Sequence, residues 1–136
     1  ALVQYSSSNS NSADEMKAMA DDYAKRYPFL EEYTSFRELR VYMSAISTQE
    51  YFIENNAKDG FDSFDEFTDL INTTEHTEKV RVFIGMVYGQ ISGYFIRERK
   101  IETGKKWILD GLKLAPDNPD LQRRLSSVED YERNYK

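Results

Sequence analysis

Apolar side chains recur along most of the chain at the spacing of one helix face. The stripes fall within residues 16–27, 36–53, 64–71, 75–99, 102–115 and 121–131. No run alternates between apolar and polar residues between hairpin turns, as a half-buried strand would. We therefore expect an all-α fold of about six helices.

Polar residues at the edges of these stripes predict where the helices begin. Three pairs have the spacing of a capping box: Ser12 with Glu15, Ser35 with Glu38, and Ser63 with Glu66. Thr73 and Thr74 are candidate caps for a helix over about 75–99. Asn118 is a candidate cap for the last helix, with Pro119 in its first turn.

The stretch from Gly85 to Pro116 predicts two helices that fold back on each other. Large and small residues alternate in it in a fixed order: Tyr88, Ile91, Ser92, Phe95, Gly104, Ile108, Gly111 and Pro116. Small residues let two helix backbones approach closely, and the bulky residues beside them fill the remaining space. This order resembles the tetratricopeptide repeat (TPR) motif of about 34 residues, although Gly stands where Ala is usual.

The resemblance implies a TPR-like, right-handed array of antiparallel helical hairpins. Residues 1–12, rich in Ser and Asn, are expected to form a flexible lead, and residues 13–136 one TPR-like helical domain. The best-matching repeat covers 85–118, and the helix over 119–134 resembles the solvating cap of such an array. The earlier hairpin, over 36–72, is predicted from helical periodicity alone.

The same resemblance implies a non-catalytic adaptor or scaffold that binds a peptide or helix. In TPR proteins the first helix of each repeat lines a concave groove, which points here to Met86, Gly89, Gly93, Ile96 and Arg97. The Lys, Asn and Arg clamp of TPR proteins that bind chaperone tails is missing from this face. Whether the groove is open or filled by the leading helix stays open at this stage.

A second motif offers a different function. The run DGFDSFDEF resembles the second half of an EF-hand calcium loop, and on that alignment the ligands are Asn55, Asp59, the Phe61 carbonyl, Ser63 and Glu66. Ala57 stands where an oxygen ligand is expected, and Asp62 replaces an aliphatic residue. The alternatives are a calcium-binding regulatory domain and a polar loop turned at Gly60.

Charge is distributed unevenly along the chain. The formal net charge is -6, which argues against a nucleic acid partner. Residues 1–79 carry 16 acidic and 7 basic side chains, whereas residues 80–136 carry 8 acidic and 11 basic ones. A basic cluster at the predicted hairpin bend could meet an acidic protein or the acidic half of a second copy, so a homo-oligomer is one alternative: Arg97, Arg99, Lys100, Lys105 and Lys106.

Nothing in the sequence points to catalysis or to a cofactor. Cysteine is absent, which excludes disulfides and thiolate chemistry, and the single His76 is expected to be a solvated residue of a first helical turn. The apolar run between Arg81 and Arg97 is too short to span a bilayer, so we expect no membrane insertion. The compartment stays open between the cytoplasm and an extracytoplasmic location after removal of an upstream signal or anchor.

Overall fold

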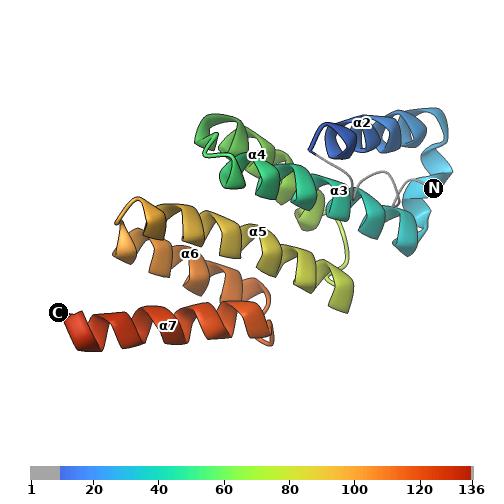
Figure 1. Cartoon of the computed structure of the whole chain (residues 1–136). Helices are drawn as coiled ribbons and strands as arrows, with labels where there is room; N and C mark the ends of the chain where they lie inside the picture. The colour runs from blue at the N-terminus through green and yellow to red at the C-terminus, as the bar shows by residue number, and fades with distance from the viewer. Residues whose placement is uncertain (1–9, 136) are drawn as a thin grey trace. The chain divides into compact units, whose positions relative to one another are not determined.

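The computed structural model describes residues 10–135. Its elements are α2 (Ser10–Arg26), η1 (Pro28–Glu32), α3 (Thr34–Ile53), α4 (Ala57–Asn72), α5 (Glu78–Arg97), α6 (Ile101–Leu114) and α7 (Pro119–Tyr135), of which η1 is a 3-10 helix (Figure 1). No strand occurs in residues 10–135, which confirms the all-α prediction. Residues 1–9 of the predicted lead lie outside the described residues, whereas residues 10–12 are already helical.

The chain divides into two compact units, and the division falls after Val80, in the first turn of α5. The first unit contains α2, η1, α3 and α4. The second contains most of α5 together with α6 and α7. The prediction of one domain over 13–136 stays a prediction.

In the first unit, α3 packs against α4 as a helical hairpin, and α2 packs against α3. The buried apolar side chains of these helices are Met16, Ala20, Val41, Met43, Ala45, Phe52, Phe67 and Ile71. Burial of such side chains from water is the main stabilising contribution to a helical unit of this kind. The stripe predicted for α2 is buried only in part, because Met19, Tyr23 and Tyr27 are exposed.

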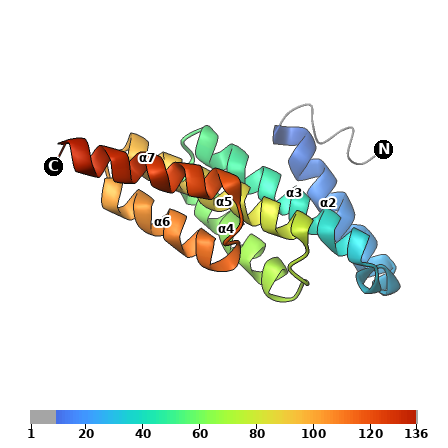
Figure 2. The ribbon, with the colours of Figure 1, turned by 90° about the horizontal axis from the view of Figure 1, so that it is seen from below.

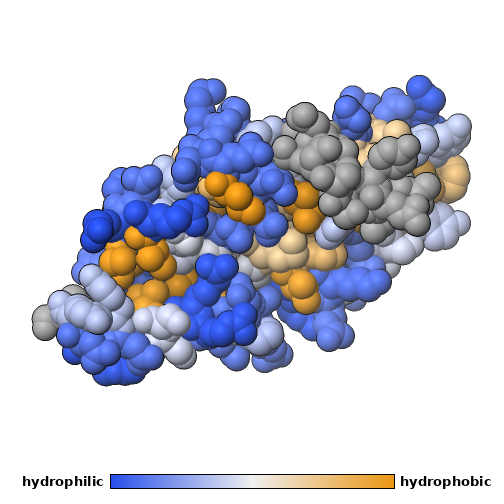
Figure 3. Space-filling model, viewed as in Figure 1, coloured by the Kyte–Doolittle hydropathy of each residue, from blue (hydrophilic) through white to orange (hydrophobic). Residues whose placement is uncertain are grey.

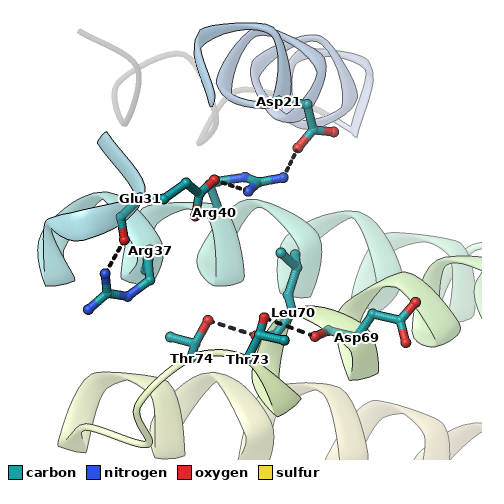
Figure 4. Close-up of polar contacts among 8 residues, drawn as sticks. All are labelled: Asp21, Glu31, Arg37, Arg40, Asp69, Leu70, Thr73 and Thr74. Atoms are coloured by element: carbon teal, nitrogen blue, oxygen red, sulfur yellow. Dashed lines mark hydrogen bonds and ion pairs between the residues drawn. The ribbon is translucent and has the colours of Figure 1, made fainter. Parts of the chain in front are cut away.

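Arg40 of α3 connects three elements of the first unit (Figure 4). Its Nη2 donates to Asp21 Oδ1 of α2 at 2.8 Å, and its Nη1 donates to Glu31 of η1. Arg37, one turn earlier on α3, donates to the Glu31 carbonyl. Because one guanidinium group satisfies two carboxylates at once, it fixes how α2 and η1 lie against α3.

The structure corrects the prediction of a loop over 55–66, because residues 57–66 are helical. α4 begins at Ala57, and its cap is Asn56, whose side chain accepts from the Asp59 amide at 3.4 Å. Ser63 therefore lies inside the helix, and its capping box with Glu66 is wrong. Gly60 lies in the same helix rather than in a turn. A Cβ there would be only 2.7 Å from the buried ring of Phe52, so glycine permits the close packing of α4 on α3.

Three other predicted helix starts are also wrong. Ser12 lies inside α2, which begins at Ser10, so it is not the cap of that helix. α3 begins at Thr34 after Tyr33, which makes no side-chain cap, and Glu38 instead accepts a hydrogen bond from Thr77 at 2.5 Å. Thr73 and Thr74 end α4 rather than begin α5, because both hydroxyls donate to the Leu70 carbonyl (Figure 4).

In the second unit, α5 and α6 form the predicted helical hairpin. Figures 1 and 2 both show α6 running beside α5. The ring centroid of Tyr88 lies 5.5 Å from that of Trp107, and Phe95 stacks on the same indole with a centroid distance of 6.5 Å. Aromatic pairs at such distances add to the stabilisation from burial.

The glycines of the hairpin stand where the two helices are closest. A Cβ at Gly104 would lie 2.7 Å from Ile96 Cγ1 and 3.1 Å from the Ser92 carbonyl oxygen. A Cβ at Gly111 would lie 2.8 Å from Tyr88 Cβ. The approach is therefore tighter than Ala permits, which explains why Gly stands at both positions.

The start of α7 confirms the predicted cap. Asn118 Oδ1 accepts from the Leu121 amide at 3.0 Å, and Pro119 is the first residue of the helix. Asn118 Nδ2 also donates to the Arg81 carbonyl of α5 at 3.4 Å. A single side chain thus begins α7 and holds it against the beginning of the hairpin.

Candidate functional site

An open groove of about 880 Å³ lies between the last turns of α5 and the middle of α7. Its lining comes from α5, the turn after it, the start of α6 and one face of α7: Gly93, Ile96, Arg97, Arg99, Ile101, Asp120, Arg123, Arg124, Ser127, Val128 and Tyr131. Figure 3 shows hydrophobic surface over the ends of α5 and α6 that lie beside α7, bordered by strongly hydrophilic surface. The groove thus combines aliphatic and aromatic side chains with four arginines.

Two glycines of α5 make room for side chains from α7. A Cβ at Gly89 would lie 2.9 Å from Arg124 Nε and 3.0 Å from Asp120 Oδ2, so these two groups lie directly on the α5 backbone. At Gly93, Nη1 of Arg124 and Nη1 of Arg97 each lie 3.4 Å from the Cβ position. Two guanidinium groups from different helices therefore converge above Gly93.

Asp120 holds the arginines of α7 in place. Its carboxylate accepts from Arg124 Nε and from Arg123 Nη2, each at 2.9 Å. Partial burial on its own would raise the pKa of Asp120, but the hydrogen bonds and positive charges of Arg124 and Arg123 outweigh it and lower that pKa below its ordinary value. Asp120 is therefore ionised at neutral pH and pairs with two of the four arginines in the lining.

The turn between α5 and α6 places Arg99 in an unfavourable backbone conformation. The Lys100 amide donates to the Phe95 carbonyl at 2.9 Å and the Arg99 amide to the Ile96 carbonyl at 3.0 Å, which is the pattern of a Schellman motif. Arg99 occupies its left-handed position with φ 63°. This position favours Gly, and a larger side chain there costs roughly 1–2 kcal/mol.

The end of α3 provides a comparison within the same chain. There the Asn56 amide bonds to the Tyr51 carbonyl and the Asn55 amide to the Phe52 carbonyl, and Asn55 has φ 60°. Asn tolerates this conformation better than other non-glycine residues. The same motif thus carries a suited residue after α3 and an unsuited one after α5, where the side chain lines the groove.

Three of the five predicted groove residues line this groove: Gly93, Ile96 and Arg97. Met86 is not part of the lining, and Gly89 is buried beneath Arg124 and Asp120. The contribution of α7 was missed, because that helix was interpreted as a cap. Its spacing could have revealed it, since residues 120, 124, 128 and 131 share one helical face.

The residues predicted to bind calcium are not arranged around an ion. Asp59, Phe61, Ser63 and Glu66 belong to the helix α4, and the Glu66 carboxylate forms an ion pair with Lys17 of α2. A calcium loop must instead wrap its oxygens around the ion. Within the described part of the chain, no three His, Cys, Asp or Glu side chains are grouped to hold a metal.

His76 is half-buried rather than solvated. Its Nε2 lies 2.8 Å from the Ile71 carbonyl oxygen. Because a carbonyl only accepts, this nitrogen carries the hydrogen, and the ring secures the chain between α4 and α5.

Comparisons with protein-family models, with curated proteins and with solved structures gave no match for this chain. In residues 10–135 no helix has the length and apolar character needed to cross a membrane.

Proposed function

We propose that this chain is a TPR-like, non-catalytic protein-interaction module that binds a peptide or helix of a partner in the groove between α5 and α7. The observation that carries the proposal is the groove itself. It lies on the side of α5, the first helix of the hairpin, where the TPR resemblance places a binding surface. Its aliphatic residues and arginines are of the kinds that contribute to protein interfaces.

The packing of the hairpin supports the TPR-like part of the proposal. Most positions that carry the motif are buried, since Tyr88, Ile91, Ser92 and Ile108 are all at most 8% exposed. Phe95 is half-buried and Pro116 is exposed. Gly104 and Gly111 lie at the closest approach of α5 and α6. Small residues at such sites are what a TPR hairpin requires.

The size of the groove suits a short segment rather than a small metabolite. About 880 Å³ is at the upper end of the range for small-molecule pockets, and this groove is open along one side. An amphipathic helix or an extended peptide could lay an apolar face on Ile96, Ile101 and Val128.

The test is a selection of random 16-residue peptides displayed on phage against the full chain. Gly93→Trp fills the groove, and its folding is checked by circular dichroism. Leu109→Trp is the matched control, because Leu109 is exposed on α6 and does not line the groove. We expect the recovered peptides to bind the wild type and Leu109→Trp but not Gly93→Trp. Failure to enrich any peptide, or equal binding to Gly93→Trp, would overturn the proposal.

A further inference from the structure

One arginine of the groove, Arg99, is placed at the expense of backbone energy. Arg99 holds a left-handed conformation that favours Gly, whereas the equivalent position after α3 carries the better suited Asn55. Strain of this kind is concentrated at functional sites. The side chain of Arg99 lines the groove, so binding is the function that this strain suggests.

Arg97 and Arg124 supply a second, independent observation. Their Nη1 atoms approach the same point above Gly93, each at 3.4 Å from its Cβ position. Both guanidinium groups reach the same part of the groove, so one anionic ligand there could contact both. A carboxylate matches a guanidinium group in shape and can accept two hydrogen bonds from it.

The lining around these groups identifies the kind of anion. It contains four arginines and one aspartate, and Asp120 already accepts from Arg123 and Arg124. Beside them lie the apolar side chains of Ile96 and Val128. The complementary ligand carries negative charges and bulky apolar groups close together.

We propose that the groove binds an internal acidic segment of a partner protein, with Asp or Glu side chains held by Arg97, Arg99 and Arg124. A large apolar side chain of the same segment packs on Ile96, Ile101 and Val128. This inference rests on the proposed function and names its ligand. A polypeptide fits better than a nucleic acid, because the lining places Ile96, Ile101 and Val128 beside the arginines, and a phosphate backbone has no apolar group to pack on them.

The experiment begins with the peptides recovered on phage, where the displayed segment is joined to the coat protein and offers no free carboxyl terminus. We expect Asp and Glu beside Leu, Ile, Phe or Trp. A synthetic copy of the best peptide is compared with one in which each Glu and Asp is replaced by Gln and Asn. The replacement should weaken binding by about tenfold or more in isothermal titration calorimetry. Equal affinity of the two peptides would overturn the inference.

One variant of the full chain, Arg99→Gly, should change stability and binding in opposite directions. Arg99→Gly should raise the melting temperature, because glycine adopts the left-handed conformation without strain. It should also weaken the binding of the acidic peptide by about tenfold, because it removes a guanidinium group from the groove. Asn55→Gly, the matched control in the same motif, should leave the affinity unchanged. If Arg99→Gly binds the peptide as the wild type does, the arginine has no part in recognition and the inference fails.

Other occupants are distinguishable by the same materials. In a further synthetic peptide, phosphoserine replaces each Glu and Asp. If it binds at least tenfold more tightly than the original acidic peptide, the groove is reassigned to phosphopeptides. Self-association of the chain in sedimentation velocity that disappears in Arg99→Gly would reassign it to the acidic half of a second copy. If the recovered peptides are neutral and their binding is lost in Gly93→Trp, the proposed function stands and the inference of an acidic ligand is overturned. If no recovered peptide loses binding in Gly93→Trp, the proposed function and the inference of an acidic ligand both fail.

Discussion

The hydroxyl oxygens of Thr48 and Ser63 lie 2.6 Å apart, and both side chains are buried between α3 and α4. The Thr48 hydroxyl donates its hydrogen to the Ser44 carbonyl at 2.8 Å. Ser63 must therefore be the donor to Thr48, since each hydroxyl has one hydrogen to give. This pair joins the two helices of the first unit through a polar contact in an apolar interior.

We predict that Thr48→Val destabilises the chain more than Ser63→Ala does. Thr48→Val leaves the Ser63 hydroxyl buried without its acceptor, which costs about 1–3 kcal/mol, whereas Ser63→Ala removes a donor and costs about 1 kcal/mol. The free energies of unfolding come from urea denaturation. In the double variant the two effects should be less than additive; additive effects would show that the hydroxyls do not interact.

Gly60→Ala and Gly93→Ala should change stability in opposite directions. Both glycines are helical, so Ala gains about 1 kcal/mol of helix propensity at each. At Gly60 the new methyl group would lie 2.7 Å from the buried ring of Phe52, which itself packs edge-on against Phe61, and we expect a net loss of about 1–2 kcal/mol. At Gly93 the nearest atoms are ends of arginine side chains at 3.4 Å, and we expect a net gain. The measurement is the melting temperature of each variant relative to the wild type. A higher melting temperature for Gly60→Ala would contradict the packing of α3 on α4.

Gly104→Ala should destabilise the hairpin by about 1–3 kcal/mol, because its methyl group would press on Ile96 and on the Ser92 carbonyl. Ile96→Ala alone leaves a cavity and is also destabilising. The double variant should lose less free energy of unfolding than the two single variants lose together, since the smaller residue at 96 leaves room for the new methyl group. Urea denaturation of the four proteins measures the coupling, and its absence would mean that α5 and α6 are further apart than described.

The stability of the chain should fall in alkali through Tyr88. Burial, and to a smaller extent the negative charge of Asp110, raise the pKa of Tyr88 above its ordinary value of 10.0. The folded state thus holds the phenol proton more tightly than the unfolded state. The resulting stabilisation is fully present below pH 10 and is lost as the pH rises toward the folded-state pKa.

Tyr88→Phe isolates this contribution. Lys105, whose pKa is raised first by its hydrogen bond to Glu132, also loses stabilisation in alkali, but it does so in both proteins. We expect the stability of the wild type to decrease relative to Tyr88→Phe between pH 9 and 11, as measured by urea denaturation at each pH. Parallel curves would show that Tyr88 ionises as freely in the folded chain as in the unfolded one.

Helices could be predicted from the sequence because the apolar stripes are long and regular. The cap at Asn118 was also readable, since the cap and the following Pro119 act over one turn of chain. The pairs Ser35 with Glu38 and Ser63 with Glu66 have the same local pattern, yet Glu38 accepts from Thr77 and Ser63 bonds to Thr48. Contacts between residues 15 and 39 positions apart outweighed a preference over three residues.

The groove was predictable only along α5. Ile96 and Arg97 were found because the motif assigns them to the first helix of a hairpin. Arg99 was predicted only as part of a basic cluster at the bend, and Arg124 was not predicted, because their places in the groove depend on a left-handed residue in a turn and on how α7 lies against α5. The shared helical face of residues 120, 124, 128 and 131 is visible in the spacing, but its position over α5 is not.

The contacts of Asn118 reach further than the cap that they form. A side chain on Gly85 would overlap the Asn118 amide, which begins α7 and donates to Arg81. Residues 85 and 118 are therefore not independent positions for evolution. Relatives that keep the amide side chain at 118 should keep glycine at 85, and those with a larger residue at 85 should have lost the amide. Covariation of these two positions in an alignment of relatives would record how α7 is anchored.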